Sequence, residues 1–300
     1  MNLKSCEQFA KEKKEALKEY LKDVNKRPLL IFNTKEDRAS NSYIRGKVKD
    51  CREIGFDSVV YNIHDLEECD YFKVEKEMVK MIELIKPAGV IIQRPLNDNY
   101  PSYIEDYIHN YLIFNGKELK SFRRFDIDGL MTGSPYTPCT ALGVVDWLEY
   151  NDISLEGKIA TVIGRSKLAG AAIAKAFESL NATVIQCNSY TSISKITSFI
   201  NESDIIVSAT GNYNLFHKYI NLDEILKHDK GHEKIFIDVG IINKDGKLVG
   251  DIPDFEIFNR ENYYKTPVPK GVGLLTRVGM LENLCEANNL RNPTDDIRNG

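Results

Sequence analysis

Apolar and polar positions along the chain follow two recurring patterns. Runs of about five apolar or β-branched residues are typical of strands buried in a parallel sheet, and the stretches between them carry apolar residues at helical spacing. In the first half these patterns predict strands at 28–32, 58–63 and 89–93 and helices at 3–21, 37–55, 67–85 and 102–114. In the second half they predict strands at 159–163, 183–187, 205–208 and 235–239 and helices at 141–150, 167–180, 192–200, 222–228 and 275–289. Alternating strands and helices predict α/β layers in both halves.

The turn after the strand at 159–163 indicates where a ligand binds. Gly164 ends the apolar run, and a helical pattern follows at once. Strand, glycine turn and helix form the opening of a mononucleotide-binding unit, in which backbone N–H groups and the helix N-terminus face a phosphate. The spacing from Gly164 to Gly170 is G-x-x-x-x-x-G rather than G-x-G-x-x-G, so an ordinary strand-to-helix turn remains an equal alternative.

The residues near this turn favour NADP over NAD. An NAD site usually has Asp or Glu about 20 residues past the glycine turn, where it binds the ribose hydroxyl. The segment 186–191 contains no carboxylate. Arg165 lies in the glycine turn, and a guanidinium with a hydroxyl such as that of Ser189 suits a 2′-phosphate.

Composition and charge narrow the class of protein. Three hundred residues suit two domains, and a net charge of −4 without clustered Lys and Arg argues against a nucleic-acid partner. No segment has the length and apolarity of a membrane span, and residues 1–24 lack the apolar core of a signal peptide. The six scattered cysteines and five histidines show no metal-binding spacing. We therefore expect a metal-free cytoplasmic protein.

Tyr43 and Lys47 lie four residues apart on a predicted helix and hence on one face. A phenol beside an ammonium group can take part in proton transfer, and desolvation in a closed cleft helps a lysine to give up its proton. A helix face with one solvated lysine is the simpler alternative. Short-chain dehydrogenases also use Tyr-x-x-x-Lys, but there the pair follows the nucleotide-binding unit, whereas here it precedes it.

Polar residues at two further places are candidates for the site, one at a strand end and one in the loop-like stretch 115–138. Gln93 ends the strand at 89–93, at the edge where open α/β sheets place ligands, although a polar residue is also an ordinary strand end. Asp126 and Asp128 flank Ile127, and in an extended segment both carboxylates would face one side. Such a pair could share a proton or bind a ring that bears N–H groups, and a solvated Asp-Gly turn is the alternative.

These features resemble the bifunctional methylenetetrahydrofolate dehydrogenase/methenyltetrahydrofolate cyclohydrolase family over nearly the whole chain. The matching motifs are Ser40-x-x-Tyr43-x-x-x-Lys47, Val90-Ile-Ile-Gln93-Arg-Pro95-Leu96, Asp126-Ile-Asp128-Gly129, Pro138-Cys139-Thr140, Gly164-Arg165-Ser166 with Gly170, Cys187-x-Ser189-x-Thr191, Asp238-Val-Gly240-Ile241, Gly250-Asp251 and Thr266-Pro-Val-Pro269-x-Gly271-Val-Gly273. Each motif is weak alone, but their shared order makes coincidence implausible.

The resemblance implies NADP-dependent oxidation of 5,10-methylenetetrahydrofolate to the methenyl form and hydrolysis of that product to 10-formyltetrahydrofolate. It assigns proton handling to Lys47, positioning of that lysine to Gln93, a contact near the reacting carbon to Tyr43, and pterin N–H binding to Asp128. Substrate contacts are also implied at Pro269 and Gly271. The implied cofactor positions are Gly164, Arg165, Ser166, Ser189, Ile241 and Thr276.

The resemblance also implies the domain plan and partners. Two α/β domains would surround a cleft: residues 1–143 as the folate-binding catalytic domain, with 275–300 packing back on it, and 144–274 as a Rossmann-type NADP domain. The expected partners are tetrahydrofolate derivatives, including polyglutamated forms, and a second copy of the chain in a homodimer. The alternatives are a dehydrogenase without cyclohydrolase activity, a non-catalytic folate- or nucleotide-binding homologue, and a shikimate-type or amino-acid dehydrogenase.

The sequence departs from the family at the rim of the expected site. The segment 130–137 is shorter than usual, Ala141 and Leu274 replace prolines, Lys270 replaces a glycine, and Asn188 stands where His is usual. These changes bear on the balance of the two activities more than on the reaction class. Lys270 and Arg94 are candidate cations for the anionic glutamate tail of folate, although surface lysines are usually only solvated.

Overall fold

The computed structural model describes residues 3–36, 38–63, 71–94, 125–130, 134–227, 232–244 and 246–290. The chain divides into two compact units. Unit 1 comprises residues 1–12 and 140–276, and unit 2 comprises residues 13–139 and 277–300. The chain passes between the units three times, within helix α1 (Cys6–Tyr20), at the start of α5 (Cys139–Tyr150) and within α9 (Val272–Ala287).

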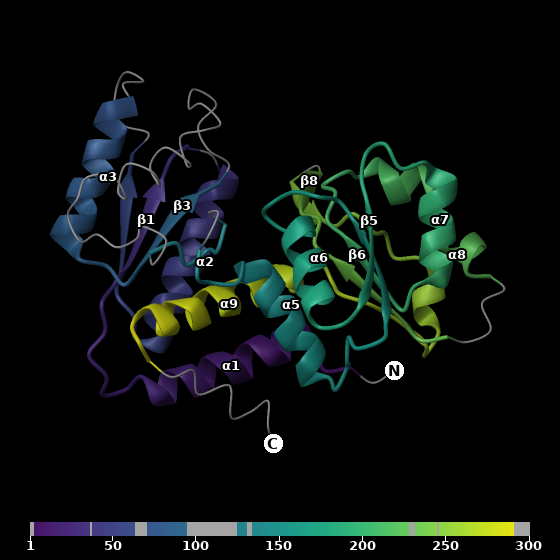
Figure 1. Ribbon diagram of the computed structural model, residues 1–300, viewed down its shortest axis with the longest axis horizontal. Coiled ribbons are helices and arrows are strands. Elements are labelled where there is room, and N and C mark those ends of the chain that lie inside the picture. Colours follow the sequence, from purple (N-terminus) through teal and green to yellow (C-terminus); the bar gives the residue numbers. More distant parts are fainter. Residues whose placement is uncertain are drawn as a thin grey trace. The chain divides into compact units, whose positions relative to one another are not determined.

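Unit 2 contains a three-stranded parallel sheet in the order β2-β1-β3. Its elements are β1 (Leu29–Asn33), α2 (Arg38–Ile54), β2 (Ser58–Asn62), α3 (Tyr71–Ile85) and β3 (Gly89–Gln93), shown in Figure 1. Side chains of the central strand alternate between two cores. Leu29 and Ile31 pack in the cluster that includes residues of α1, α2 and α9, and Leu30 and Phe32 pack in the cluster that includes residues of α3. All five residues of β1 are therefore buried, as expected for a strand covered on both faces.

The second half of α9 belongs to the core of unit 2. Met280, Leu281 and Leu284 join the cluster that contains Leu29 and Ile31. Glu282 forms a buried ion pair with Lys13 at 2.9 Å. The expected C-terminal helix that returns to the first α/β layer is confirmed.

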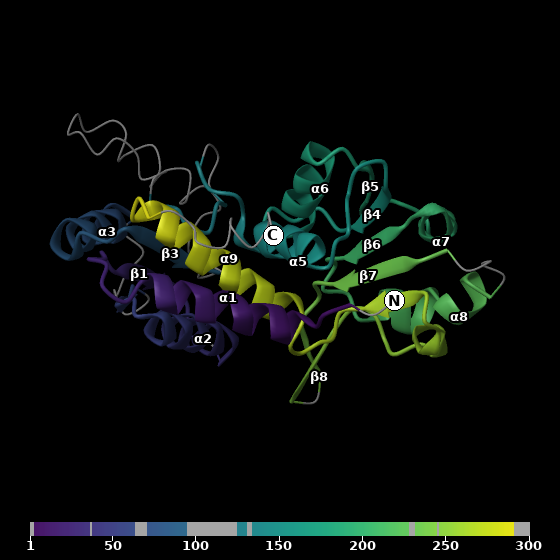
Figure 2. The same ribbon diagram turned by 90° about the horizontal axis from the view of Figure 1, so that it is seen from below.

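Unit 1 contains a five-stranded parallel sheet in the order β10-β7-β6-β4-β5. Its strands are β4 (Ile159–Ile163), β5 (Thr183–Cys187), β6 (Ile205–Ser208), β7 (Lys234–Asp238) and β10 (Tyr263–Lys265). Numbered within the unit, this order is 2-1-3-4-5, a doubly wound order whose switch point lies between the first and third strands, β4 and β6. Figure 2 shows α6 (Gly170–Ser179) and α7 (Ile193–Glu202) on opposite sides of this sheet. The predicted parallel, Rossmann-type α/β fold is confirmed.

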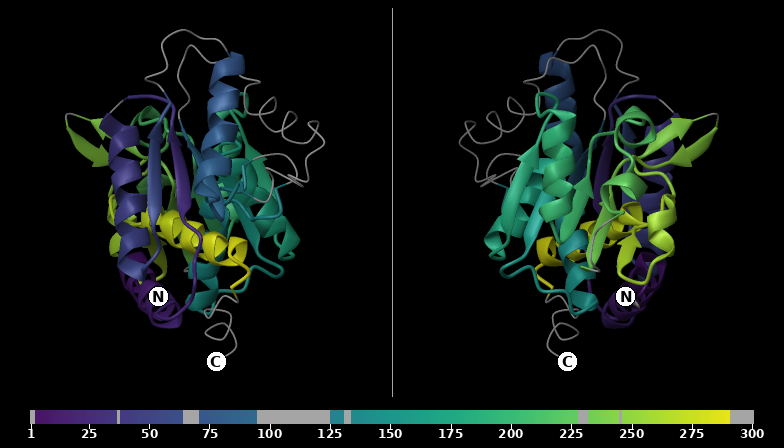
Figure 3. Two further views of the ribbon diagram at one scale, coloured as in Figure 1. Left: turned by 90° about the vertical axis from the view of Figure 1, so that its left-hand side faces the viewer. Right: turned by 90° about the vertical axis from the view of Figure 1, so that its right-hand side faces the viewer.

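Smaller elements complete unit 1. They are the π-helix η2 (Leu215–Tyr219), α8 (Leu222–Ile225), the hairpin strands β8 (Ile242–Lys244) and β9 (Lys247–Val249), and the 3₁₀-helix η3 (Glu256–Asn259). Both views of Figure 3 show the hairpin projecting from the unit. No helix in the described part of the chain combines the length and apolarity needed to cross a membrane.

Several predicted boundaries need correction. The strands at 159–163, 183–187 and 205–208 are exact, whereas β7 lies one residue earlier than predicted. Helix α6 begins at Gly170 rather than at residue 167, because the carbonyl of Ser166 accepts bonds from Ala169 and Ala171 in a preceding turn. Helix α9 begins at Val272, earlier than predicted, and β10 and the hairpin were not predicted. The predicted helix at 102–114 and the tail at 291–300 lie outside the described residues.

Candidate functional site

Three polar side chains converge in unit 2. Lys47 projects from α2, Gln93 ends β3, and Asp128 lies in the turn that follows Ile127. The Lys47 ammonium donates a hydrogen bond to Gln93 Oε1 at 3.3 Å and lies 3.8 Å from Asp128 Oδ1. Lys47 is 9% exposed, so the solvated-lysine alternative does not hold. The structure brings together three of the four residues predicted to be catalytic.

The orientation of the Gln93 side-chain amide is fixed by two hydrogen bonds, and a third holds its backbone. Its NH₂ group donates to the carbonyl of Arg94 at 2.6 Å, which leaves the oxygen to accept from Lys47. The Gln93 backbone carbonyl accepts from the hydroxyl of Thr34 at 3.0 Å. An amide oxygen held toward an amine restricts where that amine can move, so Gln93 is well placed to position Lys47.

The turn that carries Asp128 is held by α9. Asn283 donates its amide N–H groups to the carbonyls of Ile127 at 2.8 Å and Thr137 at 2.9 Å, and the thiol of Cys139 donates to the Ile127 carbonyl at 3.1 Å. Burial, and then the charge of Asp128, hold the pKa of the Cys139 thiol well above its usual range, so the thiol is a donor and not a nucleophile. Asn283 was not among the residues predicted from the sequence. The feature that could have indicated it is an amide side chain within an apolar helical stretch.

Asp126 does not pair with Asp128 in the way an extended segment would allow. The segment is a turn, closed by a bond from the Gly129 N–H to the Asp126 carbonyl at 3.0 Å. Gly129 has φ +68°, and a Cβ there would lie 2.7 Å from the Tyr136 carbonyl oxygen. The extended conformation, on which the expectation of two carboxylates facing one side depended, is therefore wrong.

Tyr43 lies on the same face of α2 as Lys47, four residues earlier. It is 38% exposed, more than the other members of the predicted catalytic set. Partial burial raises the pKa of its phenol, and the charge of Arg277 opposes that rise. The phenol is therefore neutral at pH 7 and available as a hydrogen-bond donor or as a flat surface for a ring.

In unit 1 the glycine turn lies at the switch point of the sheet. Gly164 has φ +118°, and a Cβ there would overlap with the backbone of Ala209, which follows β6. A Cβ on Gly170 would overlap with the carbonyl of Gly164. The two glycines thus allow turn, strand and helix to approach closely, and the exposed Arg165 and Ser166 lie in this turn.

Arg165 and Ser189 lie just beyond the same edge of the sheet. Ile163 of β4 is paired with Cys187 of β5, and each of the two residues follows its strand end by two positions. The loop after β5 is closed by bonds from Asn188 N–H to Thr191 Oγ1 at 3.1 Å and from Thr191 N–H to the Asn188 carbonyl at 2.9 Å. Ser189 is exposed on this closed loop.

The remaining predicted positions lie after β7 and after β10. Ile241 is 39% exposed beyond the end of β7, and the Thr276 hydroxyl donates to the carbonyl of Val272 at 3.0 Å. A cis peptide bond precedes the exposed Pro269, and a Cβ on Gly271 would overlap with the carbonyl of Pro267.

Lys270 is a non-glycine residue at φ +80°, in the left-handed region. Its ammonium lies 3.1 Å from a carboxylate oxygen of Glu7. Both side chains are exposed. Lys270 therefore already has an anionic partner within unit 1.

Two buried carboxyl groups link the strand ends. Asp238 ends β7 and accepts N–H bonds from Gly240 at 3.1 Å, Asp251 at 3.0 Å and Ile252 at 2.9 Å. Asp251 accepts from the hydroxyl of Ser208 at 2.7 Å. Burial, with a contribution from Asp251, raises the pKa of Asp238 to about 7. This network fixes the backbone that leads to Ile241.

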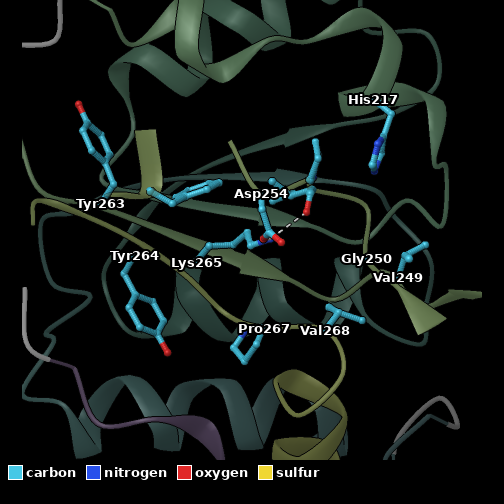
Figure 4. Close-up of a pocket in the computed structure, with 12 residues that line it drawn as sticks. His217, Val249, Gly250, Asp254, Tyr263, Tyr264, Lys265, Pro267 and Val268 are labelled. Carbon is cyan, nitrogen blue, oxygen red and sulfur yellow. Dashed lines mark hydrogen bonds and ion pairs between the residues drawn. The ribbon is translucent and has the colours of Figure 1, made fainter. Parts of the chain in front are cut away.

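A pocket of about 570 Å³ lies in unit 1 at the C-terminal end of β10 (Figure 4). Lys265 extends from β10 to the carbonyl of Ile252 at 3.1 Å and pairs with Asp254. Pro267 and Val268 connect the pocket to the loop of Pro269, but none of the predicted cofactor residues lines it. The described residues contain no group of His, Cys, Asp and Glu that could hold a metal ion.

Comparison with known proteins identifies the family. Residues 4–111 match the tetrahydrofolate dehydrogenase/cyclohydrolase catalytic domain, and residues 138–292 match the NAD(P)-binding domain of the same family. The chain is 33% identical over 295 residues to the bifunctional protein FolD of Oceanobacillus iheyensis, an alignment that covers 96% of this chain and 95% of the relative. It is 31% identical over 277 residues to that of Caldanaerobacter subterraneus, covering 91% of this chain and 92% of the relative.

Solved structures agree. The bifunctional enzyme FolD of Campylobacter jejuni has a TM-score of 0.78 at 27% identity and covers 96% of this chain and 99% of its own. The Trypanosoma brucei enzyme, solved with NADP cofactor and an inhibitor, has a TM-score of 0.72 at 25% identity, covering 96% of this chain and 97% of its own. The chain belongs to the tetrahydrofolate dehydrogenase/cyclohydrolase family.

Proposed function

We propose that this protein is a bifunctional one-carbon folate enzyme. It oxidises 5,10-methylenetetrahydrofolate to 5,10-methenyltetrahydrofolate with NADP and hydrolyses the product to 10-formyltetrahydrofolate. The observation that carries this proposal is the convergence of Lys47, Gln93 and Asp128 within the part of the chain assigned to unit 2. A shikimate-type or amino-acid dehydrogenase is set aside, because both family models match this chain.

Unit 2 is proposed to bind the folate and unit 1 the cofactor. In unit 2, Asp128 would accept hydrogen bonds from N–H groups of the pterin, and Tyr43 would lie against the ring near the reacting carbon. Pro269 and Gly271 would add substrate contacts. The fixed turn around Asp128 supports its role, because a carboxylate held in place loses little entropy when it binds N–H donors.

The hydrolytic step needs proton transfer. Addition of water to the methenyl carbon creates a hydroxyl group whose proton must leave, and breaking the bond from that carbon to N5 requires a proton on N5. The overall reaction releases one proton. Lys47 is the group proposed to accept and return these protons, with Gln93 holding its nitrogen in place. The dehydrogenase step chiefly needs the two rings held close and water excluded.

The residues of the glycine turn fit a dinucleotide phosphate. Gly164 and Gly170 allow the turn to pack closely against Ala209 and against the start of α6. The N-terminus of α6, which follows this turn, is the kind of position that binds a phosphate. The exposed Arg165 and Ser189 are proposed to bind the 2′-phosphate, and Ser166, Ile241 and Thr276 to lie near the nicotinamide. When bound, NADP supplies the acceptor for the hydride.

The finer assignments rest on the family resemblance. We propose a homodimer formed through the cofactor-binding unit, a cytoplasmic location, and polyglutamated folates among the substrates. A dehydrogenase without cyclohydrolase activity is the second candidate. The intact contact between Lys47 and Gln93 argues against it, because that contact has no evident use in hydride transfer.

A two-part spectroscopic assay tests the proposal. Purified protein is mixed with 5,10-methylenetetrahydrofolate and either NADP or NAD, and reduced cofactor and the methenyl compound are followed by absorbance. Hydrolysis is then measured alone, by the decay of added methenyltetrahydrofolate. We expect reduction of NADP in preference to NAD and enzyme-dependent hydrolysis. Absence of both signals would favour a non-catalytic binding protein, and absence of hydrolysis alone would favour the dehydrogenase-only form.

A further inference from the structure

Arg277 lies beside the proposed folate site, in unit 2. Its Nε is 2.8 Å from Oδ2 of Asp50, which is almost fully buried on α2. Tyr43, Gly46, Lys47 and Asp50 are spaced so that they share one face of α2. The Arg277 side chain therefore lies against the face of α2 that carries Tyr43 and Lys47.

The side chain of Arg277 passes directly over Gly46. A Cβ on Gly46 would overlap with Nη1 of Arg277, so the guanidinium occupies the space that any other residue at position 46 would fill. The charge of Arg277 also acts on the Tyr43 phenol. The guanidinium is thus close to both the backbone of α2 and the ring of Tyr43.

The ion pair with Asp50 holds the guanidinium of Arg277 in place but leaves the side chain partly exposed to solvent. The Arg277 side chain is 26% exposed, whereas that of Asp50 is 3% exposed. Asp50 also lies 3.4 Å from the ammonium of Lys14, so its charge is shared between two cations. Among the described residues Asp50 is the one carboxylate paired with Arg277. An arginine has five N–H donors in a planar fork, and this pair uses only part of that capacity.

We propose that Arg277 binds a carboxylate of the glutamate tail of the folate substrate. The inference rests on the proposed function, because Tyr43 marks the folate site only within it. Tetrahydrofolates carry an anionic glutamate beyond the ring system, and a guanidinium fork is the side chain best suited to a carboxylate. Lys270, a candidate from the sequence, is paired with Glu7 in unit 1. Asp50 orients Arg277, and Gly46 provides the space that it occupies.

The test compares two substrates that differ only in the tail. Wild-type protein and Arg277→Met are assayed with 5,10-methylenetetrahydrofolate and with the carboxamide of 5,10-methylenetetrahydropteroate, which has neither the glutamate nor a free carboxylate. For the glutamate-bearing substrate we expect Arg277→Met to lower kcat/KM by about 10- to 100-fold, mainly through KM, as for a lost hydrogen bond between charged groups. For the carboxamide we expect a change of less than about 2-fold. Arg277→Lys should recover part of the loss on the glutamate-bearing substrate, since a lysine keeps the charge without the fork.

Lys14→Met is the matched control, because it removes the other cation from Asp50 outside the proposed site. The kcat/KM of Lys14→Met for each of the two substrates should equal that of the wild type. Equal losses on both substrates in Arg277→Met would overturn the inference and assign the residue to positioning of Tyr43. The wild type alone provides a second check that needs no variant: similar KM values for the two substrates would also overturn it. Failure of the wild type to oxidise either substrate would instead refute the proposed function.

Discussion

We expect the substitution Asp238→Asn to remove most of the pH dependence of stability that arises in unit 1. Asp238 is 1% exposed and accepts three backbone N–H bonds at the end of β7. Burial is the largest cause of its raised pKa, and the nearby Asp251 adds to it. An asparagine cannot titrate, but it keeps one oxygen to accept the bonds from Gly240 and Asp251.

The size of the effect follows from the two pKa values. The pKa of Asp238 rises from 3.8 to about 7 on folding, so between these values the folded state holds a proton that the unfolded state has lost. The free energy of unfolding therefore falls as pH rises through this window. A difference of about 3 between the two pKa values corresponds to about 4 kcal/mol in the free energy of unfolding, because a pKa difference of one corresponds to about 1.4 kcal/mol. This contribution is fully present below about pH 4 and is lost by about pH 7.

The variant should carry a constant cost of its own. Its NH₂ group would face the N–H of Ile252, which now donates to Asp238 at 2.9 Å, so one buried donor loses its acceptor. Such a loss costs about 1–3 kcal/mol. At pH 5 the wild type has already lost about 1.6 kcal/mol of the contribution, so the two proteins should be similar in stability. At pH 8 the wild type has lost about 4 kcal/mol, so the variant should be the more stable by about 1–3 kcal/mol.

The single tryptophan makes the measurement specific to unit 1. Trp147 is fully buried there, beside Tyr264 at 5.5 Å between ring centroids, so its fluorescence reports unfolding of the unit that contains Asp238. Urea unfolding of both proteins is followed from pH 5 to pH 8. Asp254→Asn serves as the control, because its carboxylate is 94% exposed in the same unit. A difference between wild type and Asp238→Asn that stays constant over this range would refute the argument.

Three further substitutions test separate parts of the structure. Lys47→Met should reduce hydrolysis of methenyltetrahydrofolate by about 10²- to 10⁴-fold, as for loss of a general acid–base, while part of the NADP reduction remains; full hydrolysis by this variant would exclude the lysine. Arg165→Ala should raise the Kd for NADP at least about 10-fold and leave that for NAD nearly unchanged, measured by calorimetry; equal losses would contradict 2′-phosphate binding. Lys270→Gly should raise the free energy of unfolding in urea by about 1 kcal/mol, because a glycine adopts φ +80° without strain and the exposed ion pair with Glu7 contributes less than that strain costs. A less stable variant would show that the ion pair contributes more, and Glu7→Gln measures the contribution of the ion pair alone.

The sheet of unit 1 could be predicted where strands are continuous apolar runs. β4 has its predicted bounds because Lys158 and Gly164 flank its apolar run, and polar residues mark one end each of β5 (Asn188) and β6 (Asp204). β10 could not be predicted, since three residues show no periodicity and only Tyr263 is fully buried. The start of α6 was misplaced because the turn at Ser166 uses the same backbone donors as a helix. Local sequence does not separate these two arrangements.

The candidate site was predictable only in part for a related reason. Lys47 and Gln93 stand at positions that their own elements explain, a helix face and a strand end. Asn283 and Arg277 act through residues far away in the sequence, the turn at Ile127 and the carboxylate of Asp50. No local pattern encodes such a partner, and it becomes visible only once α9 is placed against the rest of unit 2.

The discontinuous make-up of the two units has a consequence for biosynthesis. Unit 2 begins at residue 13, yet its core includes Met280, Leu281 and Leu284, which the ribosome adds only after the last residue of unit 1. Unit 1 has all its residues once position 276 has emerged. Unit 1 can therefore finish folding before unit 2, and the segment 13–139 of unit 2 must wait with part of its apolar surface uncovered.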